Sequence, residues 1–126
     1  MRITGIHHVE LTVSNLQRST DFYSKIPGFK IVAEYPNFVM FSCCNLYLGL
    51  TDHKGKQTTE KFSELHIGLD HLAFGVESYD DLVAAQELGR TLGVETGEIQ
   101  KLSNGTHILV FRDPDYIQLE FAWKGK

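Results

Sequence analysis

The sequence predicts an α+β fold built from two copies of one βαβββ module. Two segments, 5–13 and 68–76, share a pattern in which a Gly lies three residues before a His and a Val lies five residues after it. Each segment continues into a polar helix cap, a helical pattern and β-rich runs. Self-similarity of this kind is typical of paired structural copies, so the repeated His8 and His71 are candidates for a shared site.

The first copy begins with an alternating segment, residues 4–13, which predicts a strand with one apolar side and one polar side. Ser14 and Asn15 are good N-caps for a helix over 16–25, which Pro27-Gly28 closes. We expect the remaining strands at 29–35, 38–43 and 46–51, with turns at Pro36-Asn37 and Cys44-Asn45.

The second copy follows a polar segment, 52–66, that has little apolar periodicity and is expected to connect the copies. A strand over 68–76 precedes Ser78, which with Asp81 forms a plausible capping box for a helix over 79–92. Further strands are expected at 94–102, 106–112 and 116–123. We therefore predict a single domain over 1–126, with module 1 at about 4–51, a linker at 52–66 and module 2 at about 67–123.

Composition narrows the class of protein. The net charge of −4 and the scattered basic residues argue against nucleic acid as a partner. No apolar run is long enough to span a membrane, and the first residues lack the apolar core of a signal peptide. Cys43 and Cys44 are expected to point to opposite faces of a strand, which makes them poor partners for a disulfide. We expect a reduced, cytoplasmic protein.

The period of two along the strands places three potential ligands on one kind of face. The His8, His71 and Glu120 faces carry small or polar side chains, whereas the opposite faces carry Val, Leu, Ile and Phe. The bulky faces should pack under the helices, and the other faces should line a pocket. Tyr47 and Glu10 are in phase with the potential ligands, and we predict that one of them, or a His of the 52–66 loop, transfers protons.

Two imidazoles and one carboxylate are suited to a divalent metal such as Fe, Mn, Ni or Zn. Three protein ligands would leave coordination positions for water or substrate. The alternative is that each His has a structural role and that Glu120 is simply exposed. Arg112, at the end of a predicted strand, is expected to be exposed, with contact to an anionic substrate as the alternative. His7 is out of phase with His8 and should point to the packed side of its strand.

Four segments of the sequence resemble those of the vicinal-oxygen-chelate superfamily, which contains glyoxalases, bleomycin resistance proteins and extradiol dioxygenases. They are His7–Val13, Leu16–Tyr23, Leu69–Phe74 and Phe111–Glu120. The resemblance implies paired βαβββ modules whose curved mixed sheets form a cleft, and a small-molecule substrate. Modules in folds of this kind pair within one chain or are exchanged between two, and we expect a homodimer. The resemblance also implies metal ligands in the first and last strands of the modules, and His8, His71 and Glu120 match three of these positions.

Gly49 departs from the pattern of the glyoxalase I enzymes that this chain resembles. They carry a carboxylate or amide-type ligand at its position, and their proton shuttle depends on Glu at the module ends. We therefore predict that the protein is not a true glyoxalase I, and that Gly49 leaves a coordination position open.

The two-His, one-carboxylate set is similar to that of extradiol dioxygenases and of metal-dependent thiol transferases. The short chain favours the transferases, although the basic cluster expected of them is not evident. The prediction is a metal-dependent enzyme, that is a lyase, dioxygenase or thiol transferase, acting on a small oxygen-chelating substrate. The alternative is a non-catalytic drug-binding protein of the bleomycin-resistance type, which would need no metal.

Overall fold

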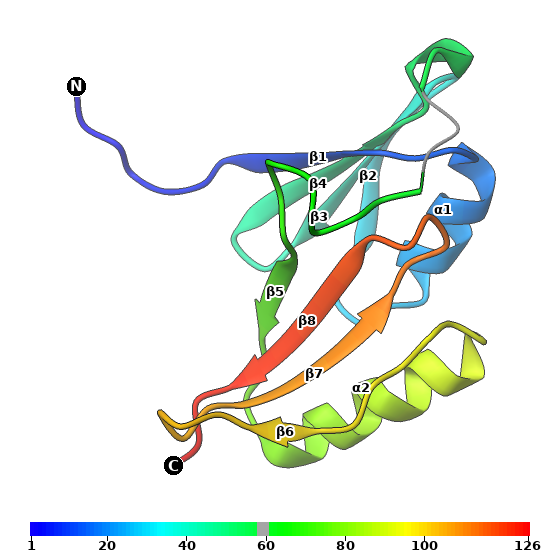
Figure 1. Ribbon diagram of the computed structural model, residues 1–126. Helices are drawn as coiled ribbons and strands as arrows, with labels where there is room; N and C mark the ends of the chain where they lie inside the picture. The colour runs from blue at the N-terminus through cyan, green and yellow to red at the C-terminus, as the bar shows by residue number, and fades with distance from the viewer. Residues whose placement is uncertain (58–60) are drawn as a thin grey trace. The chain divides into compact units, whose positions relative to one another are not determined.

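The computed structural model describes residues 1–57 and 61–126, and two compact units divide the chain, Met1–Glu60 and Lys61–Lys126. Part of the predicted linker, residues 58–60, lies outside the described residues. Each unit consists of a strand, a helix and three further strands (Figure 1). The predicted repeat of a βαβββ module is therefore confirmed.

The first unit is a four-stranded mixed sheet with strand order β1-β4-β3-β2. The first strand pairs in parallel with the last, and the strands between them form antiparallel hairpins. Its elements are β1 (His8–Thr12), α1 (Leu16–Ser24), β2 (Lys30–Tyr35), β3 (Phe38–Cys43) and β4 (Leu46–Thr51), followed by the short 3₁₀ helix η1 (His53–Gly55).

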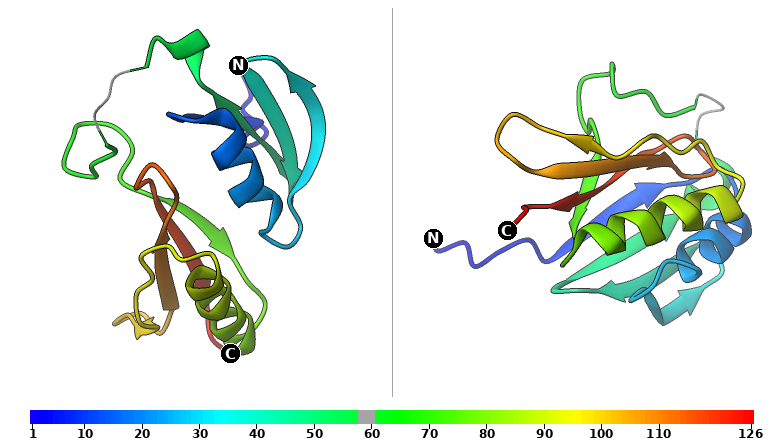
Figure 2. Two further views of the ribbon diagram at one scale, coloured as in Figure 1. Left: turned by 90° about the vertical axis from the view of Figure 1, so that its right-hand side faces the viewer. Right: turned by 90° about the horizontal axis from the view of Figure 1, so that it is seen from below.

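The second unit repeats this topology with strand order β5-β8-β7-β6. Again the first strand runs parallel to the last one. The elements are β5 (Leu72–Gly75), α2 (Tyr79–Thr91), β6 (Gln100–Lys101), β7 (His107–Arg112) and β8 (Gln118–Trp123). Figure 2 shows each helix lying along one face of the sheet of its own unit.

Both helices begin where the capping residues predict. The Asn15 side chain accepts a hydrogen bond from the backbone N–H of Arg18 at 2.9 Å, and Ser78 accepts one from Asp81 at 3.1 Å. These bonds satisfy backbone donors that have no partner within the helix.

None of the helices in the described part of the chain has the length and apolar character of a membrane span.

The core of each unit lies between the helix and the bulky face of the sheet, as the strand alternation predicts. Phe41, Leu48 and Leu50 in the first unit, and Leu109, Phe111 and Leu119 in the second, are completely buried. Removal of this apolar surface from water is the main stabilising contribution. The opposite faces remain available for polar side chains.

The prediction of a strand over 94–102 is wrong for most of these residues, because the regular strand there, β6, contains only Gln100 and Lys101. Thr96 forms an isolated bridge with Phe111, and the regular ladder resumes only at Gln100, opposite Ile108. Four residue steps separate Thr96 from Gln100, but three separate Phe111 from Ile108, so one extra residue interrupts the pairing. An insertion of this kind breaks a ladder locally and bends the strand.

Candidate metal site

The first unit places the predicted polar face of β1 beside that of β4. In the parallel register, His8 lies opposite Tyr47 and Glu10 lies opposite Gly49. Because side chains alternate along a strand, His8, Glu10, Tyr47 and position 49 share one face. The alternation of side chains along the sequence therefore predicted correctly which residues share this face.

His7 does not point to the packed side of the sheet, and that prediction is wrong. Its Nδ1 lies 2.9 Å from Nδ1 of His8, so one of the two rings donates a hydrogen bond to the other. Its ring also lies 5.7 Å from the ring of Tyr47, centroid to centroid. The reason is local: β1 begins at His8, so the alternation of the strand does not extend to residue 7.

The second unit brings His71 and Glu120 together. His71 comes directly before β5, and Glu120 lies on β8 opposite Ala73. Nε2 of His71 and Oε2 of Glu120 are 3.7 Å apart, with side chains 36% and 15% exposed, respectively. Both side chains are therefore partly open to solvent.

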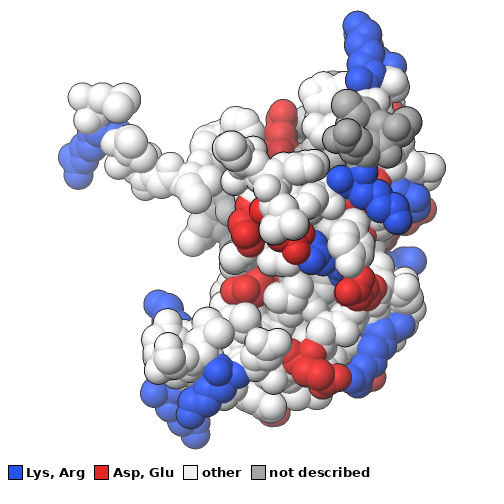
Figure 3. All heavy atoms as spheres, viewed as in Figure 1, with Lys and Arg blue, Asp and Glu red and all other residues white. Residues whose placement is uncertain are grey.

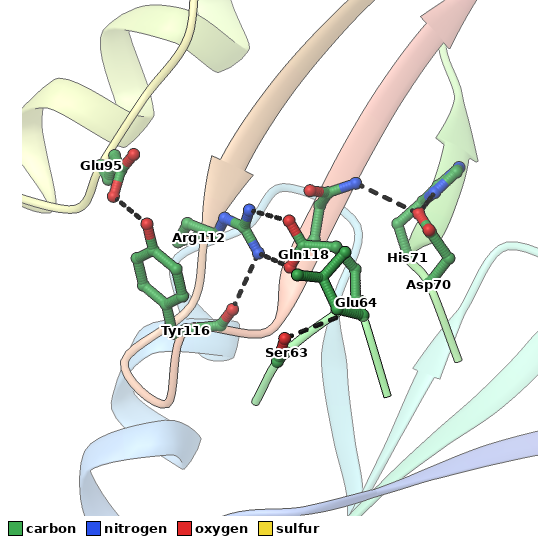
Figure 4. A network of polar contacts seen from close by, with 9 residues as sticks. Ser63, Glu64, Asp70, His71, Glu95, Arg112, Tyr116 and Gln118 are labelled. Carbon is green, nitrogen blue, oxygen red and sulfur yellow. Dashed lines mark hydrogen bonds and ion pairs between the residues drawn. The ribbon is translucent and has the colours of Figure 1, made fainter. Parts of the chain in front are cut away.

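Asp70 holds the ring of His71 in a defined orientation. Its Oδ1 lies 2.6 Å from Nδ1 of His71, and Figure 4 shows the two side chains in contact. A carboxylate at this position accepts the Nδ1–H bond, which leaves the lone pair of Nε2 available. The alternation of side chains does not reveal this role of Asp70, although an Asp directly before a candidate ligand His is a signal visible in the sequence.

The pair formed by His71 and Glu120 fits a divalent metal. Metal–nitrogen and metal–oxygen bonds of about 2.1 Å each allow the two donor atoms to lie up to about 4.2 Å apart. The observed 3.7 Å is within this limit. Within the described part of the chain, no group of three or more His, Cys, Asp or Glu side chains gathers in one place where it could hold a metal ion.

The space in front of Gly49 is filled, so the expectation of an opening there is wrong. A Cβ atom at this position would lie 2.9 Å from Cγ of Glu10 and 2.9 Å from Cε2 of Phe38. The absence of a side chain at Gly49 makes room for the stem of Glu10 on the neighbouring strand. The carboxylate on this part of the sheet therefore comes from β1 instead of β4.

Arg112 is not exposed, contrary to the prediction. Its guanidinium donates two hydrogen bonds to the carboxylate of Glu64, at 2.8 and 3.0 Å, and its side chain is only 13% exposed (Figure 4). The guanidinium holds the pKa of Glu64 at about 2, well below its usual value. This pair ties residues 61–66 to the end of β7.

Tyr116 completes the same network in an unusual backbone conformation. Its φ is 71°, a left-handed value that is rare for a non-glycine residue. The guanidinium of Arg112 lies 4.3 Å from the centre of its ring, and its hydroxyl donates to Glu95 at 2.6 Å. These contacts offset the backbone strain. Arg112 is thus part of a structural network and is not free to bind a substrate anion.

An open hollow of about 500 Å³ lies at the far end of β4, away from Tyr47. It is lined by Asn37, Thr51, His53, Lys54, Lys56 and Gln57. Nε2 of His53 and Oγ1 of Thr12 are 3.0 Å apart, so this His already has a partner. The hollow contains none of the predicted ligands.

Figure 3 shows basic and acidic side chains interspersed on one face of the molecule.

The Glyoxalase/Bleomycin resistance protein/Dioxygenase superfamily model matches residues 5–121, which is nearly the whole chain. The chain belongs to this superfamily. A solved glyoxylase/bleomycin resistance protein/dioxygenase domain from Frankia sp. EAN1pec is 32% identical, with a TM-score of 0.82 over 99% of this chain and 100% of that one. The fold predicted by the resemblance is therefore confirmed.

Curated relatives in this superfamily carry two different enzyme names. Metallothiol transferase FosB of Staphylococcus haemolyticus is 31% identical over 78 residues, which cover 62% of this chain and 53% of the relative. This chain thus spans about half the length of that relative. Lactoylglutathione lyase of Neisseria meningitidis serogroup B is 29% identical over 124 residues, covering 93% of this chain and 88% of the relative.

Proposed function

We propose that the protein is a divalent-metal-dependent enzyme that acts on a small oxygen-chelating substrate. His8, His71 and Glu120 are the proposed ligands of the metal. The observation that carries the proposal is the geometry in the second unit, where Asp70 orients His71 and Nε2 of His71 lies 3.7 Å from the carboxylate of Glu120. An oriented imidazole beside a carboxylate is a typical set of metal donors.

Each residue of the proposed site has a distinct role in the proposed mechanism. When bound, a divalent ion supplies a Lewis acid for charge on a chelating substrate oxygen. Asp70 holds Nδ1–H of His71 and so fixes the tautomer that can bind the ion. Glu10 is the proposed base, because its side chain extends from β1 over Gly49. Tyr47, opposite His8 and 42% exposed, is the proposed proton donor.

Of the two reactions named for the curated relatives, we propose thiol transfer. The glyoxalase I enzymes that this chain resembles use more than one module-end carboxylate in their proton shuttle, whereas Glu10 is the one base proposed here and Gly49 supplies no second carboxylate. Thiol transfer requires that an electrophilic substrate be polarised and that its leaving oxygen be stabilised, for which one metal and one proton donor are sufficient.

Metal titration of protein prepared without an affinity tag tests the proposal. We expect one divalent ion per chain in calorimetry and elemental analysis, and loss of binding in His8→Ala, His71→Ala and Glu120→Ala. His66→Ala is the matched control, since His66 is an exposed His in the second unit outside the site. Stoichiometric binding that persists in a His8→Ala/His71→Ala double variant would show the ligand assignment to be wrong.

An activity assay separates the two reactions. We expect the metal-loaded wild type to transfer a low-molecular-weight thiol to an epoxide substrate, and to show no appreciable turnover of the methylglyoxal–glutathione hemithioacetal. Rapid turnover of the hemithioacetal would contradict the choice of reaction. Absence of any metal binding would instead favour the drug-binding alternative, because sequestration of a drug does not require a Lewis acid.

A further inference from the structure

The two cysteines of the chain lie side by side at the turn between β3 and β4. Their Sγ atoms are 3.2 Å apart, although adjacent side chains on a strand normally point to opposite faces. Cys43 is the last residue of β3, and Cys44 lies in the turn with a left-handed φ of 53°. The alternation ends at Cys43, so the prediction that these residues point apart is wrong.

The two sulfur atoms differ in their surroundings. Cys43 is only 4% exposed, whereas Cys44 is open to solvent. Burial, and then the hydrogen bond and charge of Cys44, raise the pKa of Cys43 to about 12. Cys43 therefore stays a thiol at neutral pH, and Cys44 is the sulfur that an oxidant in solution can reach.

We propose that Cys43 and Cys44 form a peroxide-responsive dithiol that closes reversibly to a disulfide within the turn. The Cys44 thiolate attacks a hydroperoxide, so that an S–O bond forms, the O–O bond breaks and the released oxygen leaves as water or an alcohol. The Cys43 sulfur then attacks Cys44, which forms the S–S bond and breaks the S–O bond. The proton of Cys43 leaves with that oxygen as water, and two electrons in total pass from the thiols to the peroxide.

The closed form should be easy to reduce. Consecutive Cα atoms are about 3.8 Å apart, whereas most disulfides join Cα atoms separated by about 4.4–6.8 Å. A disulfide between neighbours is therefore strained, and strained disulfides have the potentials of labile, regulatory bonds. A thiol reductant should return the pair to its open form, as a switch requires.

The position of the pair connects it to the candidate metal site. Cys43 lies opposite Leu46 in the β3–β4 hairpin, and the next pair along the ladder is Ser42 with Tyr47. Tyr47 in turn lies opposite His8 on β1. Closure of the ring must change the backbone of the turn, directly beside the end of β4 that carries Tyr47.

Mass spectrometry of the purified chain tests the proposal independently of any enzymatic activity. After treatment with hydrogen peroxide, we expect the intact mass to fall by the mass of two hydrogen atoms and the free thiols to fall from two per chain to none. The loss should map to the tryptic peptide 31–54, which contains both cysteines. Dithiothreitol should restore the original mass.

Cys44→Ser is the matched control, because it removes the exposed sulfur and keeps the buried one. We expect this variant to lose the mass change and to keep its remaining thiol, with thermal unfolding confirming that it is folded. In Cys43→Ser, the sulfenic acid on Cys44 should persist long enough to be trapped by dimedone. Oxidation of wild-type Cys44 to sulfinic or sulfonic acid without loss of two hydrogens would overturn the proposal, as would a disulfide formed only between chains.

Discussion

Individual side chains in this protein are oriented by their immediate neighbours in the sequence. Asp70 accepts the bond from Nδ1 of His71 at 2.6 Å, and His7 shares a hydrogen bond with His8 at 2.9 Å. In both units a candidate ligand therefore has one ring nitrogen engaged by the preceding residue. This leaves Nε2 of each His as the nitrogen available to a metal.

Replacement of Asp70 by Asn should weaken metal binding without removing a proposed ligand. Loss of an orienting carboxylate typically costs about 10–100-fold in metal affinity. We expect an effect of this size for Asp70→Asn in calorimetric titration with Zn²⁺ or Mn²⁺. Glu77→Gln, an exposed change in the same unit, serves as the control. Equal affinities for the two variants would argue against the orienting role.

Gly49 should be sensitive to the addition of a single methyl group. A Cβ at this position would approach Glu10 and Phe38 at 2.9 Å, so Gly49→Ala should force both side chains to move. Overpacking of this kind typically costs about 1–3 kcal/mol of unfolding free energy. Gly75→Ala is the control, because its Cβ would meet no atom within 4 Å. Urea unfolding of both variants should show the difference, and equal stabilities would mean that the space is not filled.

The sequence pattern predicted which side chains share a face of the sheet better than it predicted whether the space beside them is filled. The period of two correctly placed His8, Glu10 and Tyr47 on one face, because this depends only on position along paired strands. It could not show that Glu10 fills the space at Gly49, because the conformation of a long side chain depends on cross-strand neighbours. The Cys43–Cys44 contact depends on a left-handed residue in a turn, which alternation does not describe.

At the level of elements, caps and hydrophobic periodicity predicted both helices to within about one residue, apart from fraying at their ends. The edge strands were less predictable. β2 contains a register shift between Ile31 and Ala33, and the pairing of residues 95–101 with β7 is interrupted in the same way. The repeat thus extends to a bulge at one edge of each sheet, beside β3 in the first unit and beside β7 in the second, and bulges at an edge hinder pairing with other chains.

The connection between residues 61–66 and β7 should respond to acid. The pKa of Glu64 is lowered to about 2 from an ordinary value of 4.5, chiefly by its hydrogen bonds to Arg112. Its contribution to the unfolding free energy is therefore present above about pH 4.5 and is lost as the pH falls towards 2. The thermal stability of wild type should exceed that of Glu64→Gln near neutral pH, and the difference should shrink in acid.

Glu77→Gln provides the reference for that comparison, because it removes the charge of a Glu that is exposed. A stability difference between wild type and Glu64→Gln that stays constant from pH 7 to pH 2 would contradict the assignment. The pair is not predictable from the sequence, because Glu64 and Arg112 are 48 residues apart and only the folded chain brings them together.

At the scale of the whole molecule, we predict a homodimer. Large apolar side chains before the first strand of each unit are open to solvent, including Ile3, Ile6, Leu65 (89% exposed) and Ile67 (108%). Exposed large apolar side chains, present in both units, are the candidates for such an interface. Sedimentation equilibrium should give twice the chain mass of 14.3 kDa.

Ile67→Asp should shift the protein towards the monomer, because association would then bury an unpaired charge. Val83→Asp is the control, since Val83 is an exposed apolar residue on α2. A wild type that sediments as a monomer at micromolar concentrations, or variants that dissociate equally, would count against this interface.

The parallel pairing of the first and last strands in each unit has a consequence for synthesis on the ribosome. β1 has no partner until β4 has emerged, and β5 has none until β8, which ends at Trp123, has been made. The first sheet can therefore close while the second is still being translated, because domains fold as units from the N-terminus. During that interval β5 is an unpaired strand preceded by exposed apolar residues, so we expect this nascent segment to be open to pairing with other chains until β8 has been made.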